Sequence, residues 1–174
     1  MLMTLSTALF PLLMIVAAAW DVLSRRIPNP LVLVLAALFL PFAWVQGMPV
    51  SEMLMHLVAG LAVLMAGYAA FALGYLGGGD AKLMGAAALW VGLSGMPQFL
   101  VLTVLAGGIL ALGVLLWSML HYDLYFWSEG LQQRLAFVKP SVPYGFAIAA
   151  GAILSVPGSW LDPTASISTW LTQI

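Results

Sequence analysis

The chain has 174 residues, of which 64% are hydrophobic and only 6% are charged, and its formal net charge is −1. Soluble domains carry about a quarter charged residues, so the composition excludes a water-soluble globule, a disordered tail and a nucleic-acid binder with a basic surface. An integral membrane protein with short connections remains. The absence of cysteine excludes disulfides, cysteine-bound zinc, iron–sulfur clusters and thiol catalysis.

Continuous apolar runs follow one another along the chain, without the alternation of a transmembrane β-strand. A spanning helix needs about 20 mainly apolar residues, and the short fourth run predicts a helix that starts in protein-lined space at the membrane edge. We therefore predict an all-α integral membrane protein, one domain over residues 1–174, with six transmembrane helices. The runs lie at residues 2–20, 31–46, 53–76, 81–96, 98–120 and 143–160.

Glycines recur every seven residues along the third and fourth runs. Small residues at such spacing let helix backbones approach closely inside a membrane. We interpret these glycines as packing positions without chemistry of their own. They are Gly60, Gly67 and Gly74, followed by Gly78, Gly85 and Gly92.

The positive charges predict the orientation. No Lys or Arg precedes the first run whereas two follow it, the reverse of a cleaved signal peptide, so we expect a retained helix. With six spans, every positive residue falls in the first, third or fifth connection, and these share one side of the membrane. The positive-inside rule makes that side the cytoplasmic face of an inner membrane, with both termini outside. The residues are Arg25, Arg26, Lys82, Arg134 and Lys139.

The fifth connection, residues 121–142, is the one long connection. Apolar side chains recur in it at steps of three and four, and aromatic residues lie near its start. The pattern is typical of a helix lying in the cytoplasmic membrane interface. A plain surface connector with anchoring aromatics and a substrate-contacting segment fit it equally well. The apolar stripe consists of Leu124, Trp127, Leu131, Leu135 and Val138.

Two aspartates lie at helix ends on the predicted cytoplasmic side, where ionisable groups tend to line a site. Asp21 directly follows the first helix, and Asp80 closes the glycine run of residues 77–79 before the fourth. Alone, Asp21 could be a loop carboxylate neutralised by Arg25, and Asp80 could cap a helix. Two carboxylates on one membrane face are better explained as a pair.

Paired carboxylates are suited to hydrolysis without a metal. Because two close carboxylates do not both ionise cheaply, they share a proton. The ionised member takes a proton from the attacking water, and the protonated member donates to the oxyanion or leaving nitrogen of a peptide bond. Gly77 and Gly79 would let an extended substrate backbone approach Asp80. In helical geometry Lys82 points away from Asp80.

The remaining polar residues offer weaker sites. His56 and His121 fall on opposite sides of the membrane in this topology, so we expect no shared metal and no cofactor. Asp123 and Glu129 could attract a basic substrate, but a solvated face of the interfacial helix explains them more simply.

Three stretches carry a resemblance to a known family. They are Gly77-x-Gly79-Asp80, the run Arg25-Arg26-Ile27-Pro28-Asn29 after Asp21, and Pro140-x-x-Pro143-Tyr144-Gly145 at the last apolar run. Together they resemble the type IV prepilin peptidases, membrane aspartyl proteases that share a glycine-x-glycine-aspartate motif with presenilins and preflagellin peptidases. With the six-helix topology, the resemblance spans essentially the whole chain.

The resemblance implies that Asp21 and Asp80 are the catalytic pair of an aspartyl endopeptidase. The implied substrate is a prepilin or pseudopilin whose short basic leader is cut at the cytoplasmic face, with membrane lipid as the other partner and no cofactor. The resemblance also implies supporting or substrate-binding roles for Gly77, Gly79, Lys82, Arg25, Arg26, Pro28, Asn29, Pro143, Tyr144 and Gly145.

Larger bacterial members of this family carry a further cytoplasmic segment between the first two helices, often with paired cysteines, which is associated with N-methylation of the cut pilin. Here that connection covers only residues 21–30 and contains no cysteine. The chain therefore resembles the short form found with Flp/Tad pili, and we expect no methyltransferase activity. Archaeal preflagellin peptidases are close neighbours of this form.

A small ion- or proton-coupled transporter or channel subunit is the alternative function. Asp21 and Asp80 would then be relay groups, and residues 77–79 a broken-helix binding site. Depth discriminates between the two functions, because a relay needs carboxylates near the middle of the membrane. Both aspartates are predicted at helix ends.

Overall fold

The chain folds into helices over the residues that the structure describes, and no strand is present among them. The structure is a computed structural model that describes residues 2–125, 143–156 and 161, with side chains from residue 8 to residue 118 in the first segment. The all-α prediction is thereby confirmed for this part of the chain. The helices are α1 (Leu2–Ser24), α2 (Asn29–Val45), α3 (Val50–Ala72), α4 (Gly78–Tyr125) and α6 (Tyr144–Leu154).

Prolines mark where three of these helices begin, and glycines mark where two of them end. Pro28, Pro49 and Pro143 immediately precede α2, α3 and α6. A backbone N–H at this position has no partner within the helix, so a proline, which lacks the N–H, costs no hydrogen bond there. Gly47 and Gly74 follow the last residues of α2 and α3 with φ of +74° and +79°. This left-handed conformation ends a helix without the steric cost that a Cβ would add.

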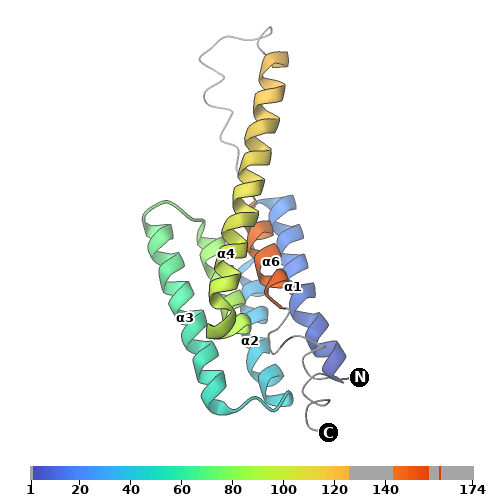
Figure 1. Cartoon of the computed structure of the whole chain (residues 1–174), viewed down its shortest axis with the longest axis vertical. Coiled ribbons are helices and arrows are strands. Elements are labelled where there is room, and N and C mark those ends of the chain that lie inside the picture. The colour runs from blue at the N-terminus through green and yellow to red at the C-terminus, as the bar shows by residue number, and fades with distance from the viewer. Residues whose placement is uncertain (1, 126–142, 157–160, 162–174) are drawn as a thin grey trace.

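The helix α4 consists of two arms that meet at Gly92. Its backbone there has φ +74° and ψ 178°, a conformation that is essentially restricted to glycine. We call residues 78–91 the first arm and residues 93–125 the second arm. The chain reverses direction between them (Figure 1). The fourth and fifth predicted runs therefore correspond to the two arms, but the break expected at residue 97 lies at Gly92, because Gly92 adopts the backbone conformation that a reversal needs.

The helices run alternately up and down in the view of Figure 1. We call the end at which α1 terminates and α2, α4 and α6 begin the upper end. The second arm of α4 returns to this end and extends beyond the other helices (Figure 1). Four helix ends thus meet in one place, although they come from distant parts of the sequence.

Trp90 of the first arm lies at the centre of the bundle and is fully buried. Its ring stacks on Phe10 of α1 with centroids 5.3 Å apart, and meets Phe39 and Phe42 of α2 at 6.0 and 5.5 Å. The indole Nε1–H donates to the Leu35 carbonyl oxygen at 2.7 Å, which satisfies the one polar atom of the ring. One aromatic side chain therefore fixes α4 against both α1 and α2.

Glycines let α3 approach the first arm of α4 closely, as predicted. A Cβ added to Gly60 would lie 3.0 Å from the Leu89 Cβ, and one added to Gly85 would lie 2.8 Å from the Leu64 Cβ. A Cβ on Gly67 would meet Ala81 at 3.2 Å. The packing prediction is confirmed for these three glycines, whereas Gly74 and Gly92 act through positive φ instead.

Two predicted boundaries are wrong. Asp21 lies inside the last turn of α1 and not after it, because the helix continues to Ser24. The connection between α1 and α2 is consequently residues 25–28, shorter than the ten residues expected. Residues 121–125 continue α4, and the rest of the predicted interfacial helix, residues 126–142, lies outside the described residues.

The outer surfaces of the helices are apolar, as a lipid-facing protein requires. By length and composition, Val50–Ala72 and Gly78–Ser118 could each cross a membrane, and the shorter helices are also apolar. The second arm of α4 measures roughly 50 Å at the α-helical rise and so exceeds a hydrocarbon core of about 30 Å, whereas the first arm measures roughly 21 Å. Six spans and the orientation with both termini outside stay predictions.

Candidate active site

Asp21 is buried where the end of α1 meets the start of α6. Its side chain is 6% exposed, and its Oδ2 accepts a hydrogen bond from the backbone N–H of Gly145 at 2.8 Å. Gly145 is the second residue of α6, where backbone N–H groups have no partner within the helix. The carboxylate of one helix therefore caps the N-terminus of another.

The contact with Asp21 requires a glycine at position 145, because a larger residue would not fit there. A Cβ built on it would lie 2.8 Å from both the Cβ and the Oδ2 of Asp21, closer than side-chain carbons approach. The neighbouring Pro143 precedes the helix, and the Tyr144 side chain is 42% exposed. Of the three motif residues, Gly145 provides the hydrogen bond to Asp21.

Asp80 is the third residue of α4 and is half-buried. Its carboxylate lies against the backbone of Gly77, the residue before the helix. The third residue of a helix is the position from which an acidic side chain can reach back toward the N-cap. A Cβ on Gly77 would lie 2.5 Å from the Asp80 Oδ2, so the Asp80 carboxylate occupies the space that a side chain at residue 77 would need.

Gly79 brings the start of α4 against the connection between α1 and α2. A Cβ built on it would lie 3.3 Å from the Ile27 Cβ. The glycines were expected to admit a substrate backbone. Both Gly77 and Gly79 are close to groups of the protein itself, which sets the position of Asp80 relative to α1, and the approach of a substrate backbone stays a prediction.

The α1–α2 connection is held by hydrogen bonds to the last turn of α1. The backbone N–H of Arg25 donates to the Asp21 carbonyl oxygen at 2.8 Å, and Arg25 has φ of +54°. The Ser24 hydroxyl donates to the Trp20 carbonyl oxygen at 2.7 Å and lies 3.0 Å from that of Arg26. The side chains of Arg25 and Arg26 are exposed.

The structure brings Asp21 and Asp80 together at the upper end of the bundle. The negative charge of Asp21 acts on Asp80, so the two carboxylates repel each other when both are ionised. Each carboxylate also lies at a helix N-terminus, Asp21 at that of α6 and Asp80 at that of α4. The partial positive charge of a helix N-terminus offsets part of such repulsion.

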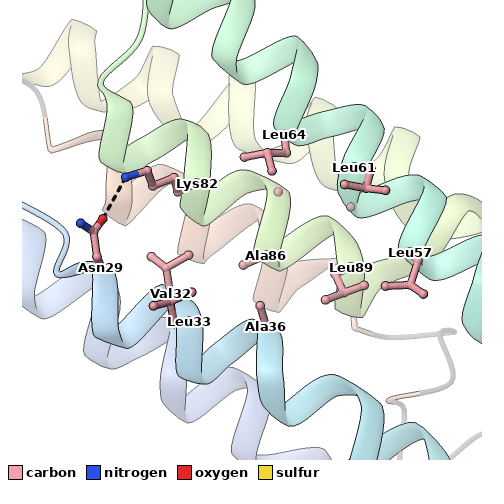
Figure 2. Close-up of a pocket in the computed structure, with 12 residues that line it drawn as sticks. Asn29, Val32, Leu33, Ala36, Leu57, Leu61, Leu64, Lys82, Ala86 and Leu89 are labelled. Atoms are coloured by element: carbon pink, nitrogen blue, oxygen red, sulfur yellow. Dashed lines mark hydrogen bonds between the residues drawn. The ribbon is translucent and has the colours of Figure 1, made fainter.

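Lys82 faces α2 and not Asp80. Its Nζ donates to the Asn29 Oδ1 at 3.0 Å, which links the first turn of α4 to the start of α2 (Figure 2). The expectation that Lys82 points away from Asp80 agrees with this contact. Pro28, directly before Asn29, has the extended backbone of a residue that precedes a helix.

His56 has a structural partner inside the bundle. Its Nδ1 lies 2.8 Å from the Leu89 carbonyl oxygen, and its ring stacks on Phe39 at 5.3 Å. Leu89 precedes the reversal at Gly92, where the regular helix hydrogen bonds stop. Within the described residues, no three His, Cys, Asp or Glu side chains gather as a metal site would require. The side chains of His121, Asp123 and Glu129 lie outside the described part.

The fold and composition define a helical membrane protein whose two interacting carboxylates lie at helix ends. Comparison with known families gives a match to the model of the type IV leader peptidase family over residues 8–112, which includes both aspartates. The match covers more than half of the chain, and the protein therefore belongs to the type IV leader peptidase family. Neither the curated proteins nor the solved structures gave a match.

Proposed function

We propose that the protein is a membrane aspartyl endopeptidase in which Asp21 and Asp80 are the catalytic residues. The observation that carries this proposal is their placement at one end of the bundle, on α1 and α4, where the charge of Asp21 acts on Asp80. Membership of a leader peptidase family accounts for the peptidase activity. The proposed catalytic unit is a single membrane domain over residues 1–174.

In the proposed reaction the two carboxylates share one proton and hold a water molecule. The ionised carboxylate takes a proton as the water oxygen bonds to the peptide carbonyl carbon, and the protonated one donates to the developing oxyanion. The C–N bond then breaks as the leaving nitrogen takes up a proton from the pair, and one hydroxyl of the intermediate returns a proton to the pair, which restores the shared proton. Gly145 orients Asp21 through its backbone N–H, and Gly77 lies against the Asp80 carboxylate.

The proposed substrates are prepilins or pseudopilins with a short basic leader. The family's type of substrate supports this assignment. The positive residues support an active site at the cytoplasmic face of an inner membrane, because three of the five lie beside the aspartates, in the connection that follows Asp21 and at the start of α4. The four-residue α1–α2 connection supports a short Flp/Tad-type enzyme without methyltransferase activity.

The positions of the aspartates favour a peptidase over an ion or proton relay. Asp21 lies in the last turn of α1, and Asp80 lies in the first turn of α4. A relay places its ionisable groups along a path through the middle of the membrane. Two interacting carboxylates at helix ends instead suit a reaction on a chain that arrives from one face.

Co-expression with a pilin precursor tests the proposal. The wild-type chain should convert the precursor to a shorter product on an immunoblot, whereas Asp21→Asn and Asp80→Asn should each leave it uncut. Asp162→Asn, on the opposite predicted side of the membrane, is the matched control and should cut normally. Precursor processing by either of the first two variants would rule out the two-aspartate mechanism.

A further inference from the structure

A groove of about 460 Å³ lies between α2, α3 and the first arm of α4, away from the two aspartates. Figure 2 shows α4 behind the groove, with α2 and α3 on its two sides. Apart from Asn29 and Lys82, the lining residues have aliphatic side chains or are glycines. The lining residues are Asn29, Val32, Leu33, Ala36, Leu57, Gly60, Leu61, Leu64, Lys82, Gly85, Ala86 and Leu89.

Small residues create this groove. Gly60 and Gly85 let α3 and α4 meet closely at its base, and Ala36 and Ala86 leave space between α2 and α4. Two leucines at its sides are exposed, Leu33 at 68% and Leu61 at 60%. In a membrane protein such outward-facing apolar side chains contact lipid, so the groove opens toward the bilayer.

The groove is polar at one end only. Lys82 and Asn29 lie together at the upper end, and Lys82 is the one charged residue in the lining (Figure 2). From there the lining continues along α4 to Leu89 and along α2 to Ala36. Seven residues of helix in each case make the groove roughly 10 Å long, parallel to the helices. A polar head and an apolar body of this length match one leaflet of a bilayer, whose hydrocarbon half is about 15 Å thick.

The shape of the groove favours a slim occupant. A groove roughly 10 Å long offers only about two turns to a partner helix, which with its side chains is itself about 10 Å wide. A single hydrocarbon chain is slim enough to lie along the whole length. The lysine ammonium adds a preference for an anionic head group, because Asn29 accepts only one of its three N–H bonds.

We propose that this groove binds an anionic phospholipid, with one acyl chain between α2 and α3 and the phosphate at Lys82. The proposal goes beyond the peptidase function and requires only that the protein lies in a membrane. Failure of either proposal therefore leaves the other unaffected. Because Lys82 lies two residues after Asp80, a bound lipid would contact the same turn of α4 that carries the candidate catalytic carboxylate.

Native mass spectrometry of the full chain in detergent micelles tests the proposal. The protein is equilibrated with equal amounts of phosphatidylglycerol and phosphatidylcholine that carry the same chains, and the lipids retained are counted. The wild-type chain should retain one lipid, with phosphatidylglycerol preferred. Lys82→Gln should lower that preference about fivefold, and Lys82→Arg should keep it, because one basic residue near the phosphates supplies it.

A second pair of variants tests the apolar part of the groove. Ala36→Leu should lower retention of both lipids, because its side chain enters the groove. Ala37→Leu, on the exposed surface one residue later, should behave as the wild type. Equal preference in wild type and Lys82→Gln, or equal retention in the two leucine variants, would overturn the proposal. A stable dimer that retains no lipid would do the same, since a second copy would then fill the groove.

Discussion

The backbone N–H of Gly145 donates to the Oδ2 of Asp21 at 2.8 Å, although 124 residues separate the two in the sequence. This bond joins the last turn of α1 to the first turn of α6 inside the bundle. The family match ends at residue 112, before α6 begins. The last helix is nevertheless part of the candidate site, because it provides the hydrogen bond that orients Asp21.

Gly145→Ala should therefore impair cleavage while the rest of the fold persists. The added Cβ would overlap the Asp21 side chain and displace the carboxylate or the start of α6. A misplacement of about 1 Å lowers an enzymatic rate roughly 100-fold, and we expect a loss of that order in kcat/KM on a pilin-derived peptide.

Gly107→Ala is the matched control, because it adds a methyl group to the facing helix of the same α4–α6 contact. That methyl group would lie 3.7 Å from the Ala147 Cβ, an ordinary contact distance. Its cleavage rate should stay close to the wild-type value. Equal rates for Gly145→Ala and Gly107→Ala would show that the Asp21–Gly145 contact has no role in catalysis.

Alanine substitutions at Gly77 and Gly79 of the Gly77-x-Gly79-Asp80 motif should lower the cleavage activity to different extents. A methyl group on Gly77 would lie 2.5 Å from the Asp80 Oδ2, whereas one on Gly79 would lie 3.3 Å from the Ile27 Cβ. Gly77→Ala forces Asp80 to move, but Gly79→Ala requires only a small shift of a side chain. In a peptide-cleavage assay, Gly77→Ala should lose roughly 100-fold in kcat/KM and Gly79→Ala clearly less. The opposite order would contradict these contacts.

Gly92→Ala should destabilise the bundle. The backbone at Gly92 has positive φ, and an added Cβ would collide with the ring of His56. The strained conformation alone costs about 1–3 kcal/mol, so we expect a loss of at least about 2 kcal/mol in the free energy of unfolding. Denaturation in detergent, followed by tryptophan fluorescence, measures it.

Gly108→Ala serves as the control for this stability measurement. Gly108 lies within the second arm of α4, and a Cβ there meets nothing within 4 Å. Replacing a helical glycine by alanine stabilises by roughly 0.5–1 kcal/mol. If both variants unfold at the wild-type denaturant concentration, the reversal of the chain does not depend on Gly92.

Cleavage should not depend on a metal ion. In the proposed reaction the water is activated by Asp21 and Asp80 alone, through a shared proton. Purified protein should accordingly cut a precursor peptide at the same rate before and after treatment with a chelator. A loss of activity that one divalent cation restores would contradict this chemistry.

The sequence was informative about the helices and about which charges share an end. Long apolar runs have few alternatives to helix, and the few polar groups fall between them, so Asp21 and Asp80 could be predicted at one end of the bundle. Their meeting follows from the alternating directions of α1, α2, α3 and α4.

The specific contacts could not be predicted in the same way. Seventeen glycines occur in the chain, and composition does not reveal that Gly92 reverses it or that Gly145 donates to Asp21. Such contacts depend on the packing of helices that are distant in sequence. The partner of His56, the Leu89 carbonyl oxygen, lies close to the interruption of the helix at Gly92, which composition does not reveal either.

The most direct test of the two-aspartate mechanism is the cleavage rate of purified Asp21→Asn and Asp80→Asn proteins on a pilin precursor in detergent. Asparagine has the shape of aspartate but does not accept the proton, so each variant should keep its helical content and lose at least about 1,000-fold in rate. A correctly folded variant of either kind that cuts at close to the wild-type rate would contradict catalysis by this pair.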